Sequence, residues 1–488
     1  MSSAQADKPR ICWGVKRGKR LVCGEPVTDE AIIKEVEELI NELKGRVERH
    51  RGKLENASFI DELIGLLERW LEEHKEDKGK KVREARKVVR KMIKLLRRLR
   101  RMWVETYWRQ FMELMELLER NAIDVIVTGE NNSEKSLTAH LYNGDVAVEV
   151  ARVAKSGSIT IFLTLSKLEG DDVKIANTFS NEKLLKAIQY GWEMTDGGIN
   201  YKHPAMVTSQ PWQVVLWPLC YPGKIRMYIN GMGINEDGVS IRWRLIANDH
   251  VAKPKEDVAK EVKKLGTERL KAFMAPAIWG DGHINVSEKY VKLYIGLSKY
   301  DLWLGIIERL VNELGFAGPY SNEYRVEVAI LSSKAVGLAR AWLSIPDVKE
   351  LIELGASLPG GEKLKRIIEL ASKEVKELGK SSIVIPGTNI SMSIDVRGDC
   401  TVELRAWRRD EEEALRLVEE LNKAGYKAVK CVYKGGHLIL ITHANVRDSP
   451  LKPIVCKKLS DLLNEARNEK RKERITKAMK NLKCFDHA

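Results

Sequence analysis

The chain has 488 residues, of which 44% are hydrophobic, and a formal net charge of +14. This length predicts about three domains, each with its own core. The positive charge favours a polyanionic partner, and nucleic acid is the commonest. No stretch approaches the ~18 consecutive apolar residues of a membrane span. Residues 1–10 lack the apolar segment of a secretory signal, so we expect a cytoplasmic protein.

The balance of charged and amide side chains bears on the source of the protein. Charged residues make up 31% of the chain, whereas glutamine occurs at only five positions. Many charges with few amides are typical of proteins from hot environments. We therefore expect a thermophilic source.

Seven cysteines are spread along the chain, with no CxxC pair and no zinc-ligand spacing to histidine. An odd number at irregular spacing predicts mainly buried free thiols. Pairing of Cys12 with Cys23 stays open, because a thermophilic intracellular protein can carry a disulfide that spacing alone does not reveal.

Residues 1–122 are predicted to form a helical, coiled-coil-like region, because apolar residues recur at three- and four-residue spacing. The third helix has a seam of Val88, Met92, Leu95, Leu99 and Met102. Its flanks are strongly basic, and two explanations stay open. Pairing with acidic residues of the first two helices is slightly favoured over an arm lying on phosphates. The seam is also a candidate homodimer interface.

The rest of the chain predicts three further parts, which makes the fold class α+β. Residues 123–260 form a β-rich domain, because apolar and polar residues alternate at 158–166, 224–228 and 239–245. Residues 261–360 and 361–488 each predict a unit of the order αββαββα, and the second carries a basic helical tail. The expected elements of these units are helices at 268–279, 298–314, 333–343, 362–378 and 410–424, and strands near 284–287, 291–297, 324–330, 383, 401–406, 428–433 and 437–441.

One segment, Met274-Ala-Pro-Ala-Ile-Trp-Gly-Asp-Gly282, resembles the nine-residue LAGLIDADG motif of homing endonucleases and related DNA-binding proteins. The resemblance implies a helix that packs closely on a second copy, with Asp281 at its C-terminal end as a catalytic and Mg²⁺-binding acid. Two positions depart from the motif. Pro276 stands where the family has glycine, and Trp279 replaces an acid. The alternative role for Asp281 is that of a turn residue in Gly-Asp-Gly.

A second copy of the motif is Gln189-Tyr-Gly-Trp-Glu-Met-Thr-Asp-Gly197, which ends a helix expected at 181–194. It makes Asp196 the candidate partner of Asp281 as a second catalytic and metal-binding acid. The residues after Gly198 indicate strand and loop without a helix between strand pairs, which argues against this copy.

Residues 123–345 also resemble the crenarchaeal repetitive PaREP family (type two b). The resemblance rests on Thr195-Asp-Gly-Gly198, Ser209-Gln-Pro-Trp-Gln213, Ile241-Arg-Trp-Arg244 and Phe273-Met-Ala-Pro276 with the following Gly-Asp-Gly282. It covers about half of the chain and implies relatives without implying an activity.

Basic and aromatic residues on alternate strand positions are the candidate nucleic-acid contacts. Any antiparallel sheet with one solvated face alternates in this way, so the pattern carries weight mainly beside the motif. The candidates are Lys224, Arg226, Arg242, Arg244, Tyr290, Lys292, Tyr294, Arg325 and Arg405.

Three functions are consistent with these features. The first is a nucleic-acid-binding protein of mobile-element lineage with a degenerate LAGLIDADG-like core, with DNA favoured over RNA. The second is an endonuclease that uses Asp281 and Mg²⁺. The third is a structural or RNA- or ribosome-interacting homo-oligomer. Steep weakening of duplex binding by salt separates the first from the third.

Overall fold

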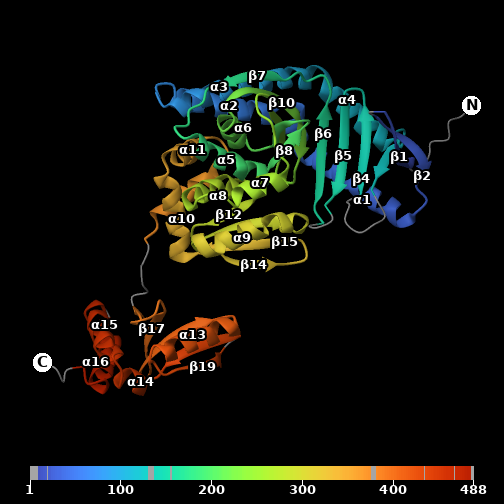
Figure 1. Cartoon of the computed structure of the whole chain (residues 1–488). Helices are drawn as coiled ribbons and strands as arrows, with labels where there is room; N and C mark the ends of the chain where they lie inside the picture. The colour runs from blue at the N-terminus through green and yellow to red at the C-terminus, as the bar shows by residue number, and fades with distance from the viewer. Residues whose placement is uncertain are drawn as a thin grey trace, which may run out of the picture. The chain divides into compact units, whose positions relative to one another are not determined.

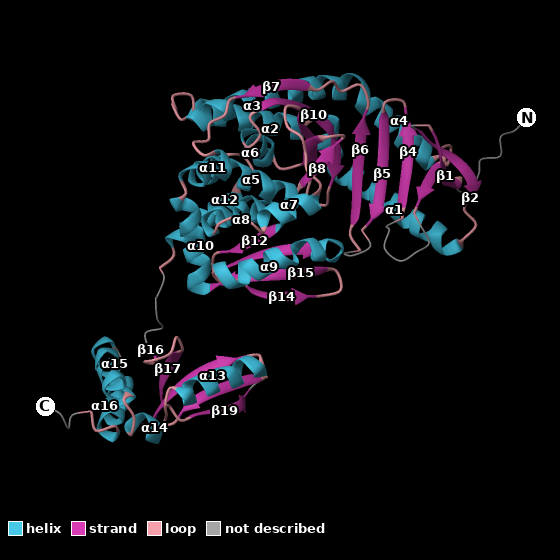
Figure 2. Cartoon of the chain, in the orientation of Figure 1, coloured by secondary structure: helices cyan, strands magenta, loops and turns pink. Residues whose placement is uncertain are grey.

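The computed structural model describes residues 9–18, 20–129, 137–153, 157–374, 381–433, 435–466 and 468–484. Half of the chain is helical and 27% lies in strands, which confirms the α+β class (Figure 2). The chain divides into two compact units, Met1–Lys373 and Glu374–Ala488. No helix among the described residues is long and apolar enough to cross a bilayer.

The predicted N-terminal helices are present, but a β-hairpin that the sequence analysis did not predict precedes them. The elements are β1 (Ile11–Arg17), β2 (Arg20–Pro26), α1 (Glu30–Glu55), α2 (Ser58–Glu73), α3 (Lys80–Met102), a π-helical turn η1 (Trp103–Tyr107) and α4 (Trp108–Glu119). The hairpin was missed because β1 and β2 are short and each contains a glycine, Gly14 or Gly24, which weakens a strand pattern. β1 also pairs in parallel with β3, which begins at Val125.

The seam of α3 is buried inside the chain itself. Val88, Met92 and Leu99 have no exposed surface, Leu95 is 3% exposed and Met102 is half-buried. Helices α2 and α6 (Pro211–Leu219) pack against α3. This seam is therefore already occupied and is not open to a second copy. The basic flank pairs with acidic residues of α2, as the favoured explanation predicted: Arg97 lies 2.7 Å from Glu68, and Arg100 lies 2.6 Å from Asp61.

An 11-stranded sheet runs through the first unit, in the order β2-β1-β3-β4-β5-β6-β10-β11-β9-β8, with β7 paired to β10. Helices α1 and α4 pack on β4, β5 and β6, and α6 packs on β9 and β11 (Figure 1). The strands before α5 are β3 (Val125–Thr128), β4 (Thr138–Asn143), β5 (Val146–Arg152), β6 (Ile159–Leu165) and β7 (Asp171–Ile175).

Two consecutive repeats of the order αββαββα follow. The first consists of α5 (Glu182–Met194), β8 (Gly197–Asn200), β9 (His203–Thr208), α6 (Pro211–Leu219), β10 (Gly223–Ile234), β11 (Val239–Ala247) and α7 (Lys255–Val262). The second consists of α8 (Thr267–Asp281), β12 (Gly282–Asn285), β13 (Tyr290–Gly296), a 3-10 turn η2 (Leu297–Lys299), α9 (Tyr300–Leu314), β14 (Ala317–Ser321), β15 (Arg325–Leu331) and α10 (Ser332–Ser344). Their strand orders match: β8-β9-β11-β10 and β12-β13-β15-β14.

The presence of α6 corrects the expectation that no helix separates the strand pairs after Gly198. Every residue of α6 after Pro211 is buried, so the segment shows no apolar stripe of helical period. Pro218 and two adjacent valines also resemble strand or loop more than helix by local propensity.

The first unit ends with α11 (Pro346–Ser357) and α12 (Glu362–Ser372). Helix α12 contacts α10, α11 and β12, so it does not begin the last unit as predicted. Residues 375–378 of the predicted helix lie outside the described residues.

The second unit has one five-stranded sheet of order β16-β17-β18-β20-β19. It contains β17, which the sequence analysis did not predict. Its elements are β16 (Ser382–Val384), β17 (Ser391–Val396), β18 (Val402–Arg408), α13 (Glu411–Lys423), β19 (Ala428–Tyr433), β20 (Gly436–Ile441), α14 (His443–Arg447), α15 (Leu451–Glu465) and α16 (Glu469–Asn481).

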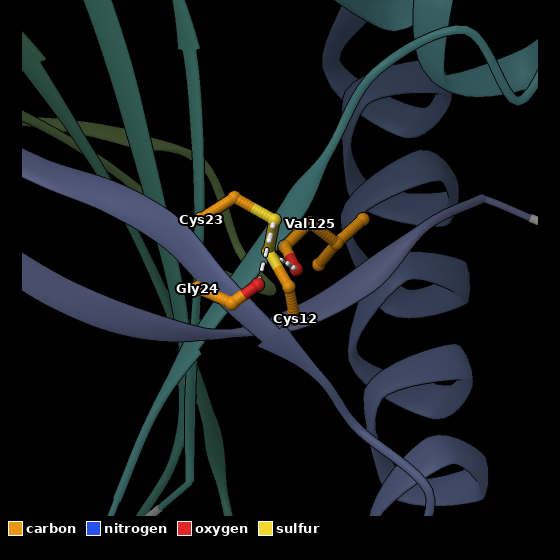
Figure 3. The surroundings of a disulfide bond; sticks show 4 residues. All are labelled: Cys12, Cys23, Gly24 and Val125. Atoms are coloured by element: carbon orange, nitrogen blue, oxygen red, sulfur yellow. Dashed lines mark hydrogen bonds between the residues drawn. A yellow bond between two sulfur atoms is a disulfide. The ribbon is translucent and has the colours of Figure 1, made fainter.

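Two disulfides correct the expectation of free thiols for four of the seven cysteines. Cys12 pairs with Cys23 across the β1–β2 hairpin, beside Val125 of β3 (Figure 3). Cys456 of α15 pairs with Cys484. Cys220, Cys400 and Cys431 are free.

Candidate functional site

The two motif-like helices, α5 and α8, pack directly against each other (Figure 1). Gly191 makes this close approach possible. A Cβ atom at Gly191 would lie 2.3 Å from the Phe273 carbonyl oxygen and 2.5 Å from Cγ of Pro276. The proline that departs from the motif therefore fits into the space left by Gly191, and α8 runs without interruption through Pro276.

This packing brings the two candidate acids together at the C-terminal ends of the helices. A Cβ atom at Gly280 would lie 3.0 Å from Oδ2 of Asp196, and Asp281 is the next residue. Burial raises the pKa of Asp281, and the nearby charge of Asp196 raises it further. The two acids that were paired from the sequence, Asp196 and Asp281, therefore lie near each other in space. If Asp281 served only as a turn residue, no acid would be expected beside it.

A buried hydrogen-bond chain holds Asp196 in place. The amide Nε2 of Gln213 donates to Oδ2 of Asp196 at 2.8 Å, and the Thr208 hydroxyl donates to Oε1 of Gln213. The backbone N–H of Gln210 donates to Thr208 Oγ1 at 3.0 Å. Gln213 and Thr208 are 5% and 8% exposed, so solvent competes little for the bond between their side chains. The sequence analysis had noted Ser209–Gln213 but assigned it no role.

Two lysines, also missed from the sequence, cap the paired helix ends. Nζ of Lys363 donates to the carbonyl oxygens of Trp279 at 2.9 Å and Gly280 at 3.0 Å. Nζ of Lys255 donates to the Thr195 carbonyl at 3.2 Å. Burial lowers the pKa of Lys363, and the charges of Asp196 and Asp281 oppose that change. The lysines satisfy free carbonyls and offset the negative helix ends.

The residues at the paired ends fit Mg²⁺ only in part. The described residues contain no group of three or more His, Cys, Asp or Glu side chains that could hold a metal ion. The protein offers two carboxylates, and one oxygen of Asp196 already accepts a hydrogen bond from Gln213. Because Mg²⁺ prefers six oxygen ligands, phosphate oxygens and water would have to complete its coordination.

An open hollow lies on each side of the aspartates. The first, of about 900 Å³, is lined by Asp196, Gly280 and Lys363 together with Phe162 and Arg242 from the large sheet. The second, of about 730 Å³, is lined by Gly280 and Asp281 together with Tyr294, Lys299 and Arg325. The first hollow lies over strands β9–β11 of the first repeat and over the neighbouring strands β4–β6. The second lies over the sheet of the second repeat.

Each hollow contains an arginine that lies over an aromatic ring. Arg242 is 4.7 Å from the ring centroid of Phe162, and Arg325 is 4.0 Å from that of Tyr294. Neither guanidinium forms an ion pair with a carboxylate of the described residues. Both arginines are exposed, so they are free to contact a ligand.

Other predicted contact residues are engaged within the chain. Lys224 and Arg226 both pair with Asp172, at 2.9 and 3.3 Å. Lys292 pairs with Glu327 at 2.7 Å and lies over the ring of Tyr290.

Two further predicted contacts differ in their surroundings. Arg405 lies in the second unit and pairs with Asp395 and Glu403. Arg244 is half-buried opposite Tyr228, and its Nε has no hydrogen-bond partner among the described residues.

The pKa of Asp281 leads to a testable stability difference. A carboxyl whose pKa is raised by folding binds its proton more tightly in the folded state, so its ionisation costs stability as the pH rises through that folded pKa. We expect Asp281→Asn to be more stable than the native chain at neutral pH. The gain should disappear below the ordinary carboxyl pKa of 3.8. Urea denaturation at several pH values measures this, and an equal effect at all pH values would contradict it.

Comparison with known proteins adds no relative: no protein-family model matches the chain, and a search of curated proteins finds no match.

Proposed function

We propose that this chain is a nucleic-acid-binding protein with a degenerate LAGLIDADG-like core, which binds double-stranded DNA across the two αββαββα repeats. The observation that carries the proposal is the pairing of α5 and α8, which brings their Asp-Gly ends together. A hollow lies on each side of these ends. The two repeats that contribute the hollows have sheets of matching strand order. A duplex has two strands related by a local twofold axis, so two similar sheets flanking one centre suit its symmetry.

The charge distribution supports a duplex at this surface. Arg242 and Arg325 provide one unpaired cation in each hollow, and Lys299 adds another to the second. Cations on both sides of the centre would hold phosphates, while Tyr294 and Phe162 keep the guanidinium groups in place. DNA is favoured over RNA, because A-form RNA presents a narrow major groove that such sheets do not enter.

Duplex binding at several salt concentrations tests the proposal. We expect the affinity for a random-sequence DNA duplex to fall steeply with salt. Arg242→Ala and Arg325→Ala should each weaken binding about tenfold and reduce the salt slope by about 1. Arg226→Ala is the matched control, because Arg226 already pairs with Asp172, and it should change the affinity little. Binding that ignores salt, or arginine variants that bind like the native chain, would contradict the proposal. An RNA duplex in the same assay identifies a preference for RNA.

A metal-dependent endonuclease is the second candidate, and the proximity of Asp196 and Asp281 favours it. These two residues would hold Mg²⁺, which when bound supplies positive charge at the phosphate being cut. Gln213 would keep the Asp196 carboxylate oriented, and Lys363 and Lys255 would limit repulsion between the two acids. Incubating the duplex with and without Mg²⁺ separates the candidates: cleavage that requires Mg²⁺ and is lost in Asp281→Asn supports the nuclease, whereas binding without cleavage supports the first proposal.

A further inference from the structure

Strand β19 forms an unprotected edge of the sheet in the second unit. Within the part of the chain that the structure describes, it pairs only with β20 and lies at the end of the strand order. Its sequence, AVKCVY, has neither proline nor glycine. Val432 is 77% exposed and Val429 is 45% exposed. Its one charged side chain, Lys430, bonds to Glu411 of α13. Lys430 therefore does not leave a free charge at the edge that would oppose pairing with another strand.

The other edge strands carry features that prevent pairing. β2 ends in Pro26 and contains Glu25, and β14 contains Pro319. β7 starts with two aspartates, Asp171 and Asp172. The remaining edges, β8, β12 and β16, are only three or four residues long. β19 thus differs from the other described edge strands, because it is both largely apolar and six residues long without a proline or glycine.

The direction of the free backbone groups follows from Ala428. Its N–H donates to Oδ1 of Asn422 at 2.8 Å, and its carbonyl accepts from Nδ2 of Asn422 at 3.3 Å. The polar backbone groups of Ala428 therefore point away from β20. Because the direction alternates along an antiparallel strand, those of Lys430 and Val432 also point to the open edge. Asn422 occupies the groups of Ala428, which leaves those of Lys430 and Val432 for a partner.

We propose that this edge joins two copies of the chain by antiparallel pairing of β19 with β19 of the partner. In one twofold register, Lys430 lies opposite Val432 of the other copy and the symmetry axis passes through Cys431. This register pairs all four free backbone groups of each copy, the N–H and C=O groups of Lys430 and Val432. Lys430 brings no repulsion across the axis, because Glu411 neutralises it. The pairing also covers Val432. A second copy suits the edge better than an unrelated peptide, because the strand is apolar and the same groups repeat symmetrically about Cys431.

The register places Cys431 opposite Cys431 of the other copy at a position without backbone hydrogen bonds. Facing Cα atoms there lie about 4.5 Å apart, within the range that a disulfide spans. Cys431 is exposed and free, so it reports on the register. With an added copper–phenanthroline oxidant, the two thiols would lose two protons and two electrons to the oxidant and form one S–S bond.

Light scattering of the full chain under reducing conditions tests the dimer. We expect twice the mass of one chain at about 100 µM. Val432→Pro removes the free N–H that would donate to Lys430 of the other copy, so the concentration at which monomer and dimer are equal should rise at least tenfold. Val384→Pro is the control. Val384 is 47% exposed on β16, the opposite edge of the same sheet. Its N–H points away from β17, because Ile385, the next residue, donates to Ile390. This variant should leave the dimer unchanged. A native chain that stays monomeric, or equal disruption by both variants, would overturn the proposal.

Oxidation tests the register in the same full-length protein. The covalent dimer should form readily in the native chain and in Cys400→Ser, and disappear in Cys431→Ser. A covalent dimer that persists in Cys431→Ser overturns the register. The proposal does not depend on DNA binding: Val432→Pro should bind a duplex like the native chain, so failure of one proposal is distinguishable from failure of the other.

Discussion

Replacing Lys81 with methionine should destabilise the first unit by about 3–5 kcal/mol. Lys81 lies in the first turn of α3 and its side chain is 3% exposed. Its Nζ lies 2.5 Å from Oδ1 of Asp347 and 2.9 Å from Glu350, both on α11. It also lies over the ring of Phe179 at 4.6 Å. Methionine fills similar space but leaves Asp347, whose side chain is 8% exposed, as a buried charge without its cation.

Urea denaturation of the full chain measures this loss, and Lys94→Met is the matched control on the same helix. Lys94 pairs with Asp171 at 2.7 Å, but its side chain is 59% exposed and Asp171 keeps Lys91 as a partner. Exposed pairs contribute little, so the control should lose less than about 1 kcal/mol. Equal losses in the two variants would show that burial does not decide the effect.

A double variant separates the unpaired charge from lost packing. In Lys81→Met/Asp347→Leu both charges of the pair are absent, so the penalty of a buried unpaired carboxylate disappears. The double variant should recover a large part of the stability that Lys81→Met loses. Ser180, which donates to Oδ2 of Asp347 at 3.1 Å, loses an acceptor, so recovery should be incomplete. No recovery at all would assign the loss to packing around Phe179.

Elements with a local signal were predictable from the sequence. Helix α5 has an Asn181 cap, whose side chain accepts from the N–H groups of Lys183 and Leu184, and α9 ends at Gly315 with a positive φ of 76°. In both cases the helix signal lies within a few residues of the structure that it specifies. The alternating strands β10, β11 and β13 were predictable for the same reason.

The parts that were missed depend on residues far away in the sequence. Helix α6 is buried on all sides, so nothing in its pattern distinguishes it from a buried strand. Lys363 caps α8 from a helix more than 80 residues later, and side-chain capping of this kind leaves no local signature. Asp196 and Asp281 could be proposed as a pair from the two motif copies, but the expected lack of a helix after Gly198 argued wrongly against them. The Gln213–Asp196 bond required the fold.

Replacing Gly191 with alanine should cost about 2–3 kcal/mol, although alanine is the better helix former by about 1 kcal/mol. The new methyl group would lie 2.3 Å from the Phe273 carbonyl oxygen, and that oxygen is backbone that cannot rotate away. The contact with Cγ of Pro276 at 2.5 Å is similarly rigid. Helices α5 and α8 must therefore move apart, and Asp196 and Asp281 move with them.

Gly337→Ala is the control, because Gly337 lies in the exposed face of α10 and its new methyl group would meet no atom within 4 Å. It should gain up to about 1 kcal/mol from helix propensity. The two variants make the same chemical change in a helix and should shift the urea midpoint in opposite directions. Separation of α5 and α8 would also weaken the effect of Asp196 on Asp281, so the pH dependence of the Asp281→Asn gain should be smaller in the Gly191→Ala background. If Gly191→Ala is as stable as Gly337→Ala, the close packing of the two helices does not fix the distance between the acids.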